Sequence, residues 1–332
     1  MKILVIQTAS IGDVILSTAV VEKLRAFYAE ATIDMLVKKG CESLFVAHPF
    51  LNEVLVWDKG RQKTLNLLHL IAVVRKKHYD VVVNVQRFFS TGLLTVLSGA
   101  RQRFGFAKNP LSVFFTKRYP HNIGDSQGAF SHEVYRNQQL ISSITDNSPE
   151  RVRLYPSKEQ WNSVSKYIGD RAYICVAPAS LWFTKQFPKH KWVEFLHHVD
   201  SDTLIYLIGG KDDFALCADI ANSIPEKRTL NLAGKLSLLE SAALMSRASM
   251  NFVCDSSPMH LATSVDAPTT AVYCSTIPEF GFGPLSSNST IVQAKDNLAC
   301  RPCGLHGHRE CPQGNFLCAE NIDIDDLVSR LS

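Results

Sequence analysis

Short apolar runs alternate along the chain with longer segments in which apolar residues recur at three- and four-residue spacing. The runs predict strands in the first half at residues 2–7, 32–38, 53–58, 80–86 and 101–106. The periodic segments predict helices at about 14–28 and 64–78. Buried strands joined through helices need right-handed crossovers, so we predict a parallel sheet with helices on both faces.

This alternation weakens from about residue 108 to residue 147 and then restarts. Residues 148–160, which contain Pro149 and Pro156, are typical of a linker. Further strands are predicted within residues 172–180, 203–210, 228–234, 251–257 and 269–275. The pattern therefore predicts two α/β domains in series.

The weakened pattern and the linker that follows it set the boundary between the two predicted domains. We expect a first domain at residues 1–155 and a second at 156–320. The last residues, about 321–332, are typical of a short helix with Asn321 or Asp323 as its cap. In two-domain α/β proteins of this kind the last helix often packs back on the first domain, and we expect the same packing here.

Length and hydrophobicity narrow the class of protein. The 332 residues are enough for two cores of about 150 residues each. No apolar run approaches the roughly 18 residues that span a bilayer. The apolar run after Lys2 is also shorter than the core of a signal peptide. We therefore expect a cytoplasmic protein.

The net charge of +4 is unevenly distributed. Residues 1–150 contain 18 Lys and Arg against 12 Asp and Glu, a net +6, and the remaining 182 residues contain 17 against 19, a net −2. The first half is the better place for an acidic partner, although spread charges also fit a solvated surface. No stretch combines dense basic residues with aromatic stacking positions, which argues against a nucleic-acid partner.

Open parallel sheets bind ligands beyond the carboxyl ends of their strands, so unusual residues there are candidates for a site. After the first strand, Gly12 permits a tight turn and Asp13 follows it. No G-x-G-x-x-G is present, which argues against a dinucleotide fingerprint. Asp13 is either a helix cap or a catalytic carboxylate, and this stretch alone leaves both interpretations open.

A second candidate stretch is "CDSSPMHLA", which ends a strand and begins a helix. The backbone N–H groups and hydroxyls near Ser256 and Ser257 would make an anion site. His260 would donate to a phosphate or orient the loop. The alternative is that a serine caps the helix and that His260 is a core histidine with its hydrogen bonds made inside the protein. The clustering of Asp255 with these residues favours the ligand-binding interpretation.

Two further strand ends carry candidate residues. In the loop after the first strand of the second half, Ser180 precedes Lys185, a lysine that would neutralise a phosphate leaving group. The alternative for Lys185 is a solvated loop position. After the next strand, Gly209 and Gly210 precede Asp213, which would accept from ribose hydroxyls or cap a helix.

Five stretches together resemble glycosyltransferase family 9, the bacterial lipopolysaccharide heptosyltransferases. They are "SIGDVILSTAVVEKLR", "PASLWFTKQFP", "GGKDD", "LAGKLSLLESAALM" and "CDSSPMHLA", in the family's order and over most of the chain. The resemblance implies a GT-B fold, with two Rossmann-like domains facing each other across a cleft. It also implies inverting transfer of a heptose or related sugar from an ADP-sugar to the lipopolysaccharide inner core.

The resemblance implies roles for single residues. Asp13 falls on the proposed catalytic base, in the acceptor-binding domain, and Lys185 falls on the lysine that contacts the donor diphosphate. The other donor-binding positions are Ser180, Asp213, Leu236, Asp255, Ser256, Ser257 and His260. Ser257 replaces the glycine of the family's D-[ST]-G, and Phe187 replaces the tryptophan of its K-x-W-P. These departures leave the transferred sugar open.

The implied acceptor is an acidic glycolipid, which adds peripheral contact with the inner membrane to a cytoplasmic location. No metal is needed for catalysis if Lys185 and the N–H groups near Ser257 neutralise the diphosphate. Two alternatives remain: a non-catalytic member that binds nucleotide sugars or glycans, and a GT-B-like sugar-nucleotide epimerase. The acceptor, the step in the pathway and the oligomeric state are left open.

The nine cysteines raise the question of whether the protein binds a metal. Five are dispersed, and four follow a C-x2-C-x7-C-x6-C spacing at Cys300, Cys303, Cys311 and Cys318. Four thiolates at such spacing are typical of a structural zinc or iron site. The alternative is a loop of the family with free thiols, since disulfides are not expected in a reducing cytoplasm.

Overall fold

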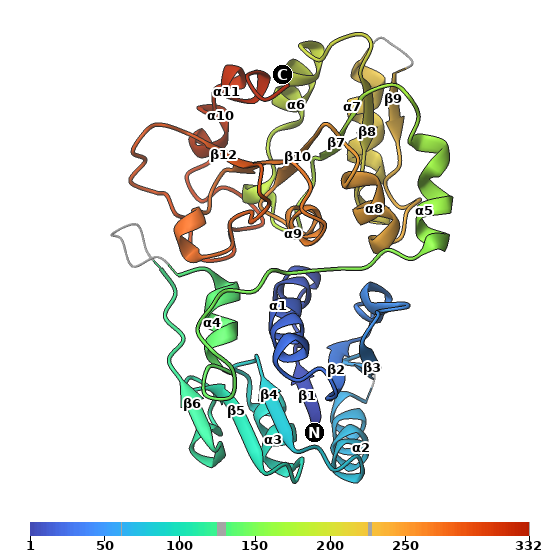
Figure 1. Ribbon diagram of the computed structural model, residues 1–332. Coiled ribbons are helices and arrows are strands. Elements are labelled where there is room, and N and C mark those ends of the chain that lie inside the picture. Colours follow the sequence, from blue (N-terminus) through green and yellow to red (C-terminus); the bar gives the residue numbers. More distant parts are fainter. Residues whose placement is uncertain (61, 125–130, 225–227, 332) are drawn as a thin grey trace. The chain divides into compact units, whose positions relative to one another are not determined.

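The computed structural model describes residues 1–60, 62–124, 131–224 and 228–331. The described chain falls into two compact units, one made of residues 1–123 with 131–155 and the other beginning at Pro156. Each unit is built on its own six-stranded parallel sheet (Figure 1). The α/β class predicted from the hydrophobic pattern is therefore confirmed.

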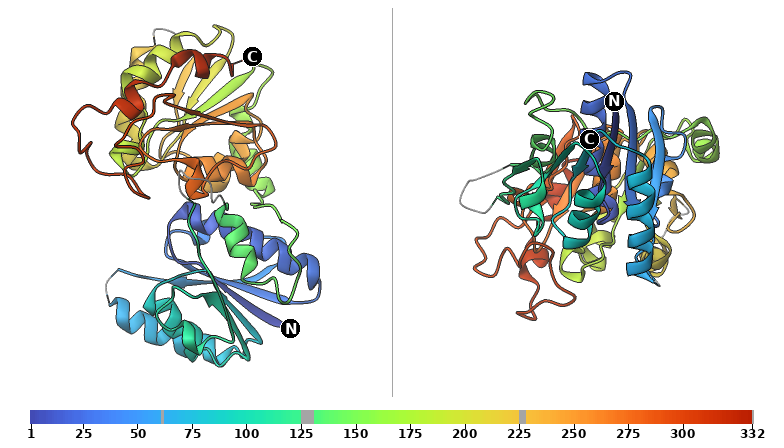
Figure 2. Two further views of the ribbon diagram at one scale, coloured as in Figure 1. Left: turned by 90° about the vertical axis from the view of Figure 1, so that its left-hand side faces the viewer. Right: turned by 90° about the horizontal axis from the view of Figure 1, so that it is seen from below.

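The sheet of the first unit has the strand order β3-β2-β1-β4-β5-β6. Its strands are β1 (Lys2–Ile6), β2 (Thr32–Lys38), β3 (Leu51–Trp57), β4 (Val81–Asn84), β5 (Gln102–Phe106) and β6 (Lys117–Tyr119). Helices pack on both faces of the sheet (Figure 2). One face carries α1 (Ile11–Phe27) and α4 (Glu133–Gln139), and the other carries α2 (Lys63–Lys76) and α3 (Phe89–Leu97). Short 3₁₀ turns are η1 (Glu42–Phe45) and η2 (Ser112–Phe114).

Three elements of this unit, β6, α3 and α4, had no predicted counterpart. Strand β6 has three residues, Lys-Arg-Tyr, at the edge of the sheet, and its exposure leaves no apolar run to detect. Helix α1 begins at Ile11 rather than near Val14, because Ser10 and Asp13 form a reciprocal capping box. The cap therefore moves the start of the helix to the turn that contains Asp13.

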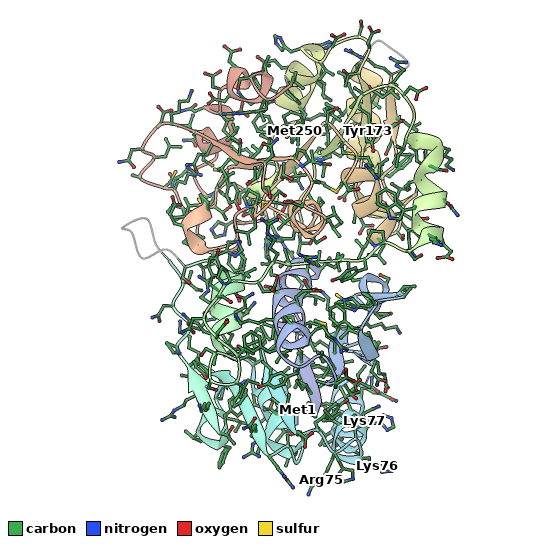
Figure 3. All side chains as sticks on the ribbon, viewed as in Figure 1. Met1, Arg75, Lys76, Lys77, Tyr173 and Met250 are labelled. Atoms are coloured by element: carbon green, nitrogen blue, oxygen red, sulfur yellow. The ribbon has the colours of Figure 1, made fainter. Side chains whose placement is uncertain are left out.

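Strand β1 lies in the middle of this sheet, and its four residues from Ile3 to Ile6 are fully buried. Each such side chain stabilises the fold by roughly 1.5–3 kcal/mol. The strand order reverses between β1 and β4, and ligands of open α/β sheets bind beyond the carboxyl ends at such a point. Met1 and the basic run Arg75–Lys77 lie at the opposite end of the unit (Figure 3).

The predicted linker at residues 148–160 is held against the first unit through most of its length. Val152 and Leu154 are buried, and the N–H of Arg153 donates to Thr18 Oγ1 at 3.0 Å. The Tyr155 hydroxyl donates to the Glu22 carboxylate at 2.9 Å. This segment is therefore part of the first unit, and only its last residues enter the next helix.

The second sheet has the order β12-β11-β10-β7-β8-β9. Its strands are β7 (Tyr173–Ala177), β8 (Leu204–Leu207), β9 (Thr229–Asn231), β10 (Met250–Cys254), β11 (Thr269–Tyr273) and β12 (Ser289–Gln293), of which only β12 was not predicted. Tyr173 and Met250 begin the neighbouring strands β7 and β10 (Figure 3). The strand order reverses between these two strands, so their carboxyl ends are the expected ligand position.

Helices also cover both faces of the second sheet (Figure 2). Helices α5 (Lys158–Val164), α8 (Leu238–Met245) and α9 (Ser257–Ser264) pack in one group, and α6 (Lys189–His197) packs with α7 (Phe214–Ser223) and α11 (Ile324–Val328) in another. The remaining helical pieces are η3 (Ser165–Tyr167), η4 (Phe183–Lys185), η5 (Lys211–Asp213), η6 (Pro278–Phe280) and α10 (Leu317–Glu320).

The C-terminal helix differs from the sequence expectation in its packing. Asp323 caps α11 by accepting from the N–H of Asp325 at 3.0 Å, as one of the two predicted caps. Ile324 and Leu327, however, are buried in the core of the second unit, where α11 packs on α6. These two apolar side chains are therefore buried within the helix's own unit. Ser332, the last residue of the predicted helix, lies outside the described residues.

None of the helices in the described ranges has the length and apolar character needed to cross a membrane.

Candidate functional site

Asp13 lies beyond the carboxyl end of β1, in the first turn of α1. Its Oδ2 accepts from the N–H of Ser10 at 3.1 Å and from the Ser10 hydroxyl at 2.5 Å. Its own N–H donates to Ser10 Oγ at 3.3 Å. Within the described part of the chain, Asp13 Oδ1 has no hydrogen-bond partner. One carboxylate oxygen thus caps the helix and the other remains available, so the cap and base interpretations are compatible.

A cluster of charged side chains lies at the same edge of the first sheet. Glu133, the first residue of α4, is paired with Arg136 at 2.7 Å and lies 3.1 Å from Nε2 of His121. Nη1 of Arg87, which follows β4, lies 3.4 Å from Nδ1 of His121. His121, Glu133 and Arg136 are each at least 95% buried. This cluster was not predicted, because His121, Glu133 and Arg136 come from the segment in which the hydrophobic pattern weakens.

The electrostatic surroundings of Asp13 favour its protonated form. Removal from water raises the pKa of Asp13 above its ordinary value, and the negative charge of Glu133 adds to the rise. Hydrogen bonds from Ser10 and the positive charge of Arg87 lower this pKa without cancelling the rise. Burial also acts to raise the pKa of Glu133, but His121 and Arg136 outweigh it, so Glu133 stays ionised.

The second unit brings Lys185 and Asp255 together. Lys185 lies in the loop after β7, and Asp255 follows the neighbouring strand β10. Lys185 Nζ lies 2.7 Å from Asp255 Oδ2, which also accepts from the Thr276 hydroxyl at 2.6 Å. The two charged side chains are only 15% and 8% exposed. An ammonium group is therefore fixed where the strand order of this sheet reverses.

The serine residues of the predicted anion site flank this pair. Ser256 is the N-cap of α9, and its hydroxyl donates to the carbonyl of Ala179 at 3.3 Å. Ser257 begins the helix, and its side chain is half-buried. His260 lies one turn further along and is only 6% exposed. The carbonyl of Ser180 accepts from the Gln186 side chain at 2.7 Å, which closes the loop that carries the lysine.

Asp213 and Leu236 lie in adjoining loops after β8 and β9. Asp213 Oδ2 accepts from the N–H of Gly210 at 2.7 Å, so this carboxylate caps its own turn. Gly234 has a positive φ of 73°, and a Cβ there would lie 2.9 Å from the Lys211 backbone. Glycine thus permits the close approach of the two loops. The predicted donor residues therefore follow four adjacent strands, β10, β7, β8 and β9.

Thr276 was missed as a site residue. It is 1% exposed and directly holds the Asp255 carboxylate. A signal was present in the sequence, because Thr276 immediately follows a predicted strand of the second sheet. What the sequence does not show is that this strand, β11, is paired with β10.

The family model described as glycosyltransferase family 9 (heptosyltransferase) matches residues 67–313 of this chain. The chain belongs to glycosyltransferase family 9. Its members are glycosyltransferases, so the transferase class expected from the five stretches is confirmed.

Known family 9 proteins resemble this chain over nearly its whole length. Lipopolysaccharide heptosyltransferase 3 of Escherichia coli is 24% identical over 298 residues, which cover 86% of each chain. The structure of E. coli ADP-heptose lipopolysaccharide heptosyltransferase II matches with a TM-score of 0.80 at 21% identity, covering 100% of this chain and 97% of the other. E. coli heptosyltransferase WaaC with ADP-2-deoxy-2-fluoro heptose matches with a TM-score of 0.74 at 18% identity, covering 100% of both chains. These likenesses show a GT-B fold.

The family 9 chain also carries the four clustered cysteines in a loop after β12, here called the cysteine-rich loop (residues 300–318, red in Figure 1). Burial, the largest single effect, acts to raise the pKa of the Cys311 thiol, but several backbone N–H groups, that of Phe316 foremost, together lower it below its ordinary value. No three His, Cys, Asp or Glu side chains among the described residues are arranged to share a metal ion. The geometry therefore does not fit a metal centre, and the predicted zinc or iron still rests on cysteine spacing alone.

Proposed function

We propose that this protein is an inverting heptosyltransferase that moves a heptose, or a related sugar, from an ADP-sugar to a lipopolysaccharide inner-core acceptor. The observation that carries the proposal is the buried Lys185–Asp255 pair at the strand-order reversal of the second sheet, in a chain of family 9. Relatives described as ADP-heptose and lipopolysaccharide heptosyltransferases supply the substrate class.

In this proposal the second unit, which begins at Pro156, binds the donor. Lys185 would place its positive charge on the diphosphate, where charge develops as the sugar leaves. The first turn of α9, with Ser256 and Ser257, would offer backbone N–H groups to the same anion. The loops with Asp213 and Leu236 would hold the ribose and the nucleoside. His260 would orient the α9 turn from the core side.

The first unit would bind the acceptor and supply the base. Inversion at the anomeric carbon requires a proton acceptor on the attacking hydroxyl, on the face opposite the leaving diphosphate. Asp13 meets the chemical requirement because its Oδ1 is not committed to the helix cap. The raised pKa of Asp13 also makes it a better proton acceptor than a fully solvated aspartate.

The excess of basic residues in the first half suits an acidic glycolipid acceptor. Contact with such an acceptor would bring the protein to the cytoplasmic surface of the inner membrane as a peripheral protein. Incubation with ADP-heptose and a truncated lipopolysaccharide tests the proposal against its alternatives. Transfer of the sugar supports it, binding without turnover indicates the non-catalytic member, and a change in the sugar alone indicates an epimerase.

The identity of the donor nucleotide can be tested by thermal stability. A ligand that binds only the native state at 100 times its Kd stabilises a protein by about 2.7 kcal/mol. We expect ADP to raise the Tm more than UDP or GDP at equal concentration, because the loops with Asp213 and Leu236 are assigned to an adenosine. Equal or larger shifts with UDP would refute the ADP assignment.

The role of Asp13 as a base predicts a pH dependence. Only the carboxylate accepts a proton, so kcat/KM should rise with pH through the raised pKa of Asp13 and level off above it. Arg87→Gln removes a positive charge that lowers this pKa, so the acid limb of the profile should move to higher pH. An acid limb that stays in place or moves to lower pH in this variant would contradict the assignment.

A further inference from the structure

The cysteine-rich loop contains none of the proposed donor-binding residues, yet its backbone forms hydrogen bonds with Thr184, the residue before Lys185. The N–H of Thr184 donates to the carbonyl of His308 at 3.1 Å, and the N–H of His308 donates to Thr184 Oγ1 at 2.8 Å. The Thr184 hydroxyl also donates to the His308 carbonyl at 3.4 Å. Thr184 is only 1% exposed, so bulk water does not compete for its hydrogen-bonding groups. The loop and the short η4 turn that ends at Lys185 are therefore joined by three hydrogen bonds.

Ser275 joins the same contact from the sheet. Its hydroxyl donates to Thr184 Oγ1 at 3.0 Å, and its N–H donates to the Thr184 carbonyl at 3.2 Å. Its own carbonyl accepts from the N–H of Cys303 at 2.8 Å. One residue at the carboxyl end of β11 thus holds both the lysine loop and the cysteine-rich loop.

The same loop also supports Asp255, the other member of the ion pair, through Thr276. The Arg301 guanidinium donates to the carbonyl of Thr276 at 2.8 Å and to the side chain of Gln293 at 2.7 Å. Thr276 in turn donates to the Asp255 carboxylate that faces Lys185. The loop therefore contacts the backbone of the residue before Lys185 and the backbone of Thr276, whose side chain holds Asp255.

Gly307 is the closest point of approach. It has a positive φ of 75°, and a Cβ on it would lie 2.8 Å from Thr184 Oγ1, 3.1 Å from Lys185 Cγ and 3.2 Å from Ser275 Oγ. Real Cβ atoms essentially never approach a heavy atom to less than 3.0 Å, so a side chain here must displace its neighbours. Lys185 is thus enclosed by the loop backbone along its stem and by Asp255 at its charged end.

We infer that Gly307 and His308 are positioning residues for Lys185, so that the cysteine-rich loop forms the back wall of the donor diphosphate site. This inference rests on the proposed function, because it takes Lys185 as the group that contacts the diphosphate. Fixing the ammonium in advance lowers the entropy lost when the anion binds. A shifted loop should therefore weaken donor binding through Lys185, without contact between the loop and the nucleotide.

Two glycines of one loop provide a matched test, with ADP as the probe. Gly304 has a positive φ of 69°, close to that of Gly307, but a Cβ on Gly304 would meet nothing within 4 Å. Alanine therefore meets the same backbone strain at both positions and contacts the lysine loop only at residue 307. We expect Gly307→Ala to weaken ADP binding, measured by calorimetry, by roughly 5- to 50-fold. Gly304→Ala should lower the Tm through backbone strain alone and leave the affinity within about twofold of wild type.

A second variant and a double-mutant cycle separate positioning from general damage. Thr184→Val removes the oxygen shared by His308 and Ser275 without changing the side-chain volume greatly, and it should also weaken ADP binding. In a Lys185→Ala, Asp255→Asn background, Gly307→Ala should cause no further loss of affinity, because the group it positions is gone.

The ADP affinities of these variants support or overturn the inference. Loss of ADP affinity in Gly307→Ala and Thr184→Val, absent in Gly304→Ala and abolished without Lys185, supports it. Equal affinities for the two glycine variants, or a loss that persists without Lys185, would overturn it while leaving the proposed function standing. An unchanged ADP affinity in the Lys185→Ala, Asp255→Asn protein would instead overturn the donor role of Lys185, and the inference with it.

Discussion

Asp13→Asn should lower the rate of sugar transfer by roughly 10²–10⁴-fold, the usual contribution of a general base, while ADP binds almost as in the wild type. Asparagine has nearly the shape of aspartate, and its Oδ1 can still accept from the N–H of Ser10. It has no basic oxygen to take the proton from the acceptor hydroxyl. Turnover with ADP-heptose and a truncated lipopolysaccharide, with ADP affinity measured in parallel, provides the test.

Glu240→Gln is the matched control for the cap. Glu240 holds the same N3 position in the capping box of α8, where its Oε2 accepts from the Ser237 N–H at 2.7 Å and its N–H donates to Ser237 Oγ at 3.3 Å. The two changes should therefore alter helix capping similarly. Only the change at Asp13 should reduce turnover. A transfer rate near that of the wild type in Asp13→Asn would leave Asp13 as a cap alone.

Lys185→Ala should have two separable effects, on stability and on donor binding. Removing the lysine leaves the Asp255 carboxylate, 8% exposed, without its counter-charge, and breaking a buried pair in this way costs about 3–5 kcal/mol. Loss of a charge-assisted contact with the diphosphate should weaken ADP binding by a further 1.5–3 kcal/mol or so, which corresponds to about a 10- to 140-fold change in Kd. Denaturant unfolding and calorimetry measure the two effects.

The double variant Lys185→Ala, Asp255→Asn distinguishes these effects. Asparagine removes the uncompensated charge, so much of the unfolding free energy should return, whereas ADP affinity should stay low. Lys189→Ala is the control in the same region, because its pair with Asp219 is 3.3 Å long and both side chains are more than half exposed. That change should cost less than about 1 kcal/mol and leave ADP binding intact. Wild-type ADP affinity in the double variant would show that the donor does not contact Lys185.

Much of the fold could be predicted from the sequence, because strands buried on both faces leave continuous apolar runs. Of the twelve strands in the described residues, ten lie at predicted positions, and the two exceptions, β6 and β12, are edge strands with exposed residues. Strand β6 contains no buried residue and β12 only one, so neither leaves a continuous apolar run, whereas the other two edge strands, β3 and β9, were predicted. Helix α4 was missed because it lies in the segment where the pattern weakens, whereas α3 is an apolar helix outside that segment, and nothing in the hydrophobic pattern explains its omission.

From the sequence, the candidate site could be predicted only as separate residues at individual strand ends. The motif stretches and the positions of the turns pointed to Asp13, Lys185 and Asp255, and the order of those stretches indicated the family. Their pairings could not be predicted, since hydrogen-bond partners such as Thr276 and Asp255 are 21 residues apart and meet only through the pairing of β10 with β11. The roles of these residues in catalysis and donor binding stay predictions.

The sequence by itself determined the α/β class, the family and the strand ends at which the chemistry is proposed, because apolar periodicity and short motifs are local properties of the chain. Only the tertiary structure decided that Lys185 lies against Asp255, that the last helix packs in the second unit, and that the cysteine-rich loop rests on Thr184. The hydrogen bond between His308 and Thr184, for example, joins residues 124 positions apart in the sequence. Long-range contacts of this kind depend on the order of strands in the sheet, a property of the folded chain as a whole.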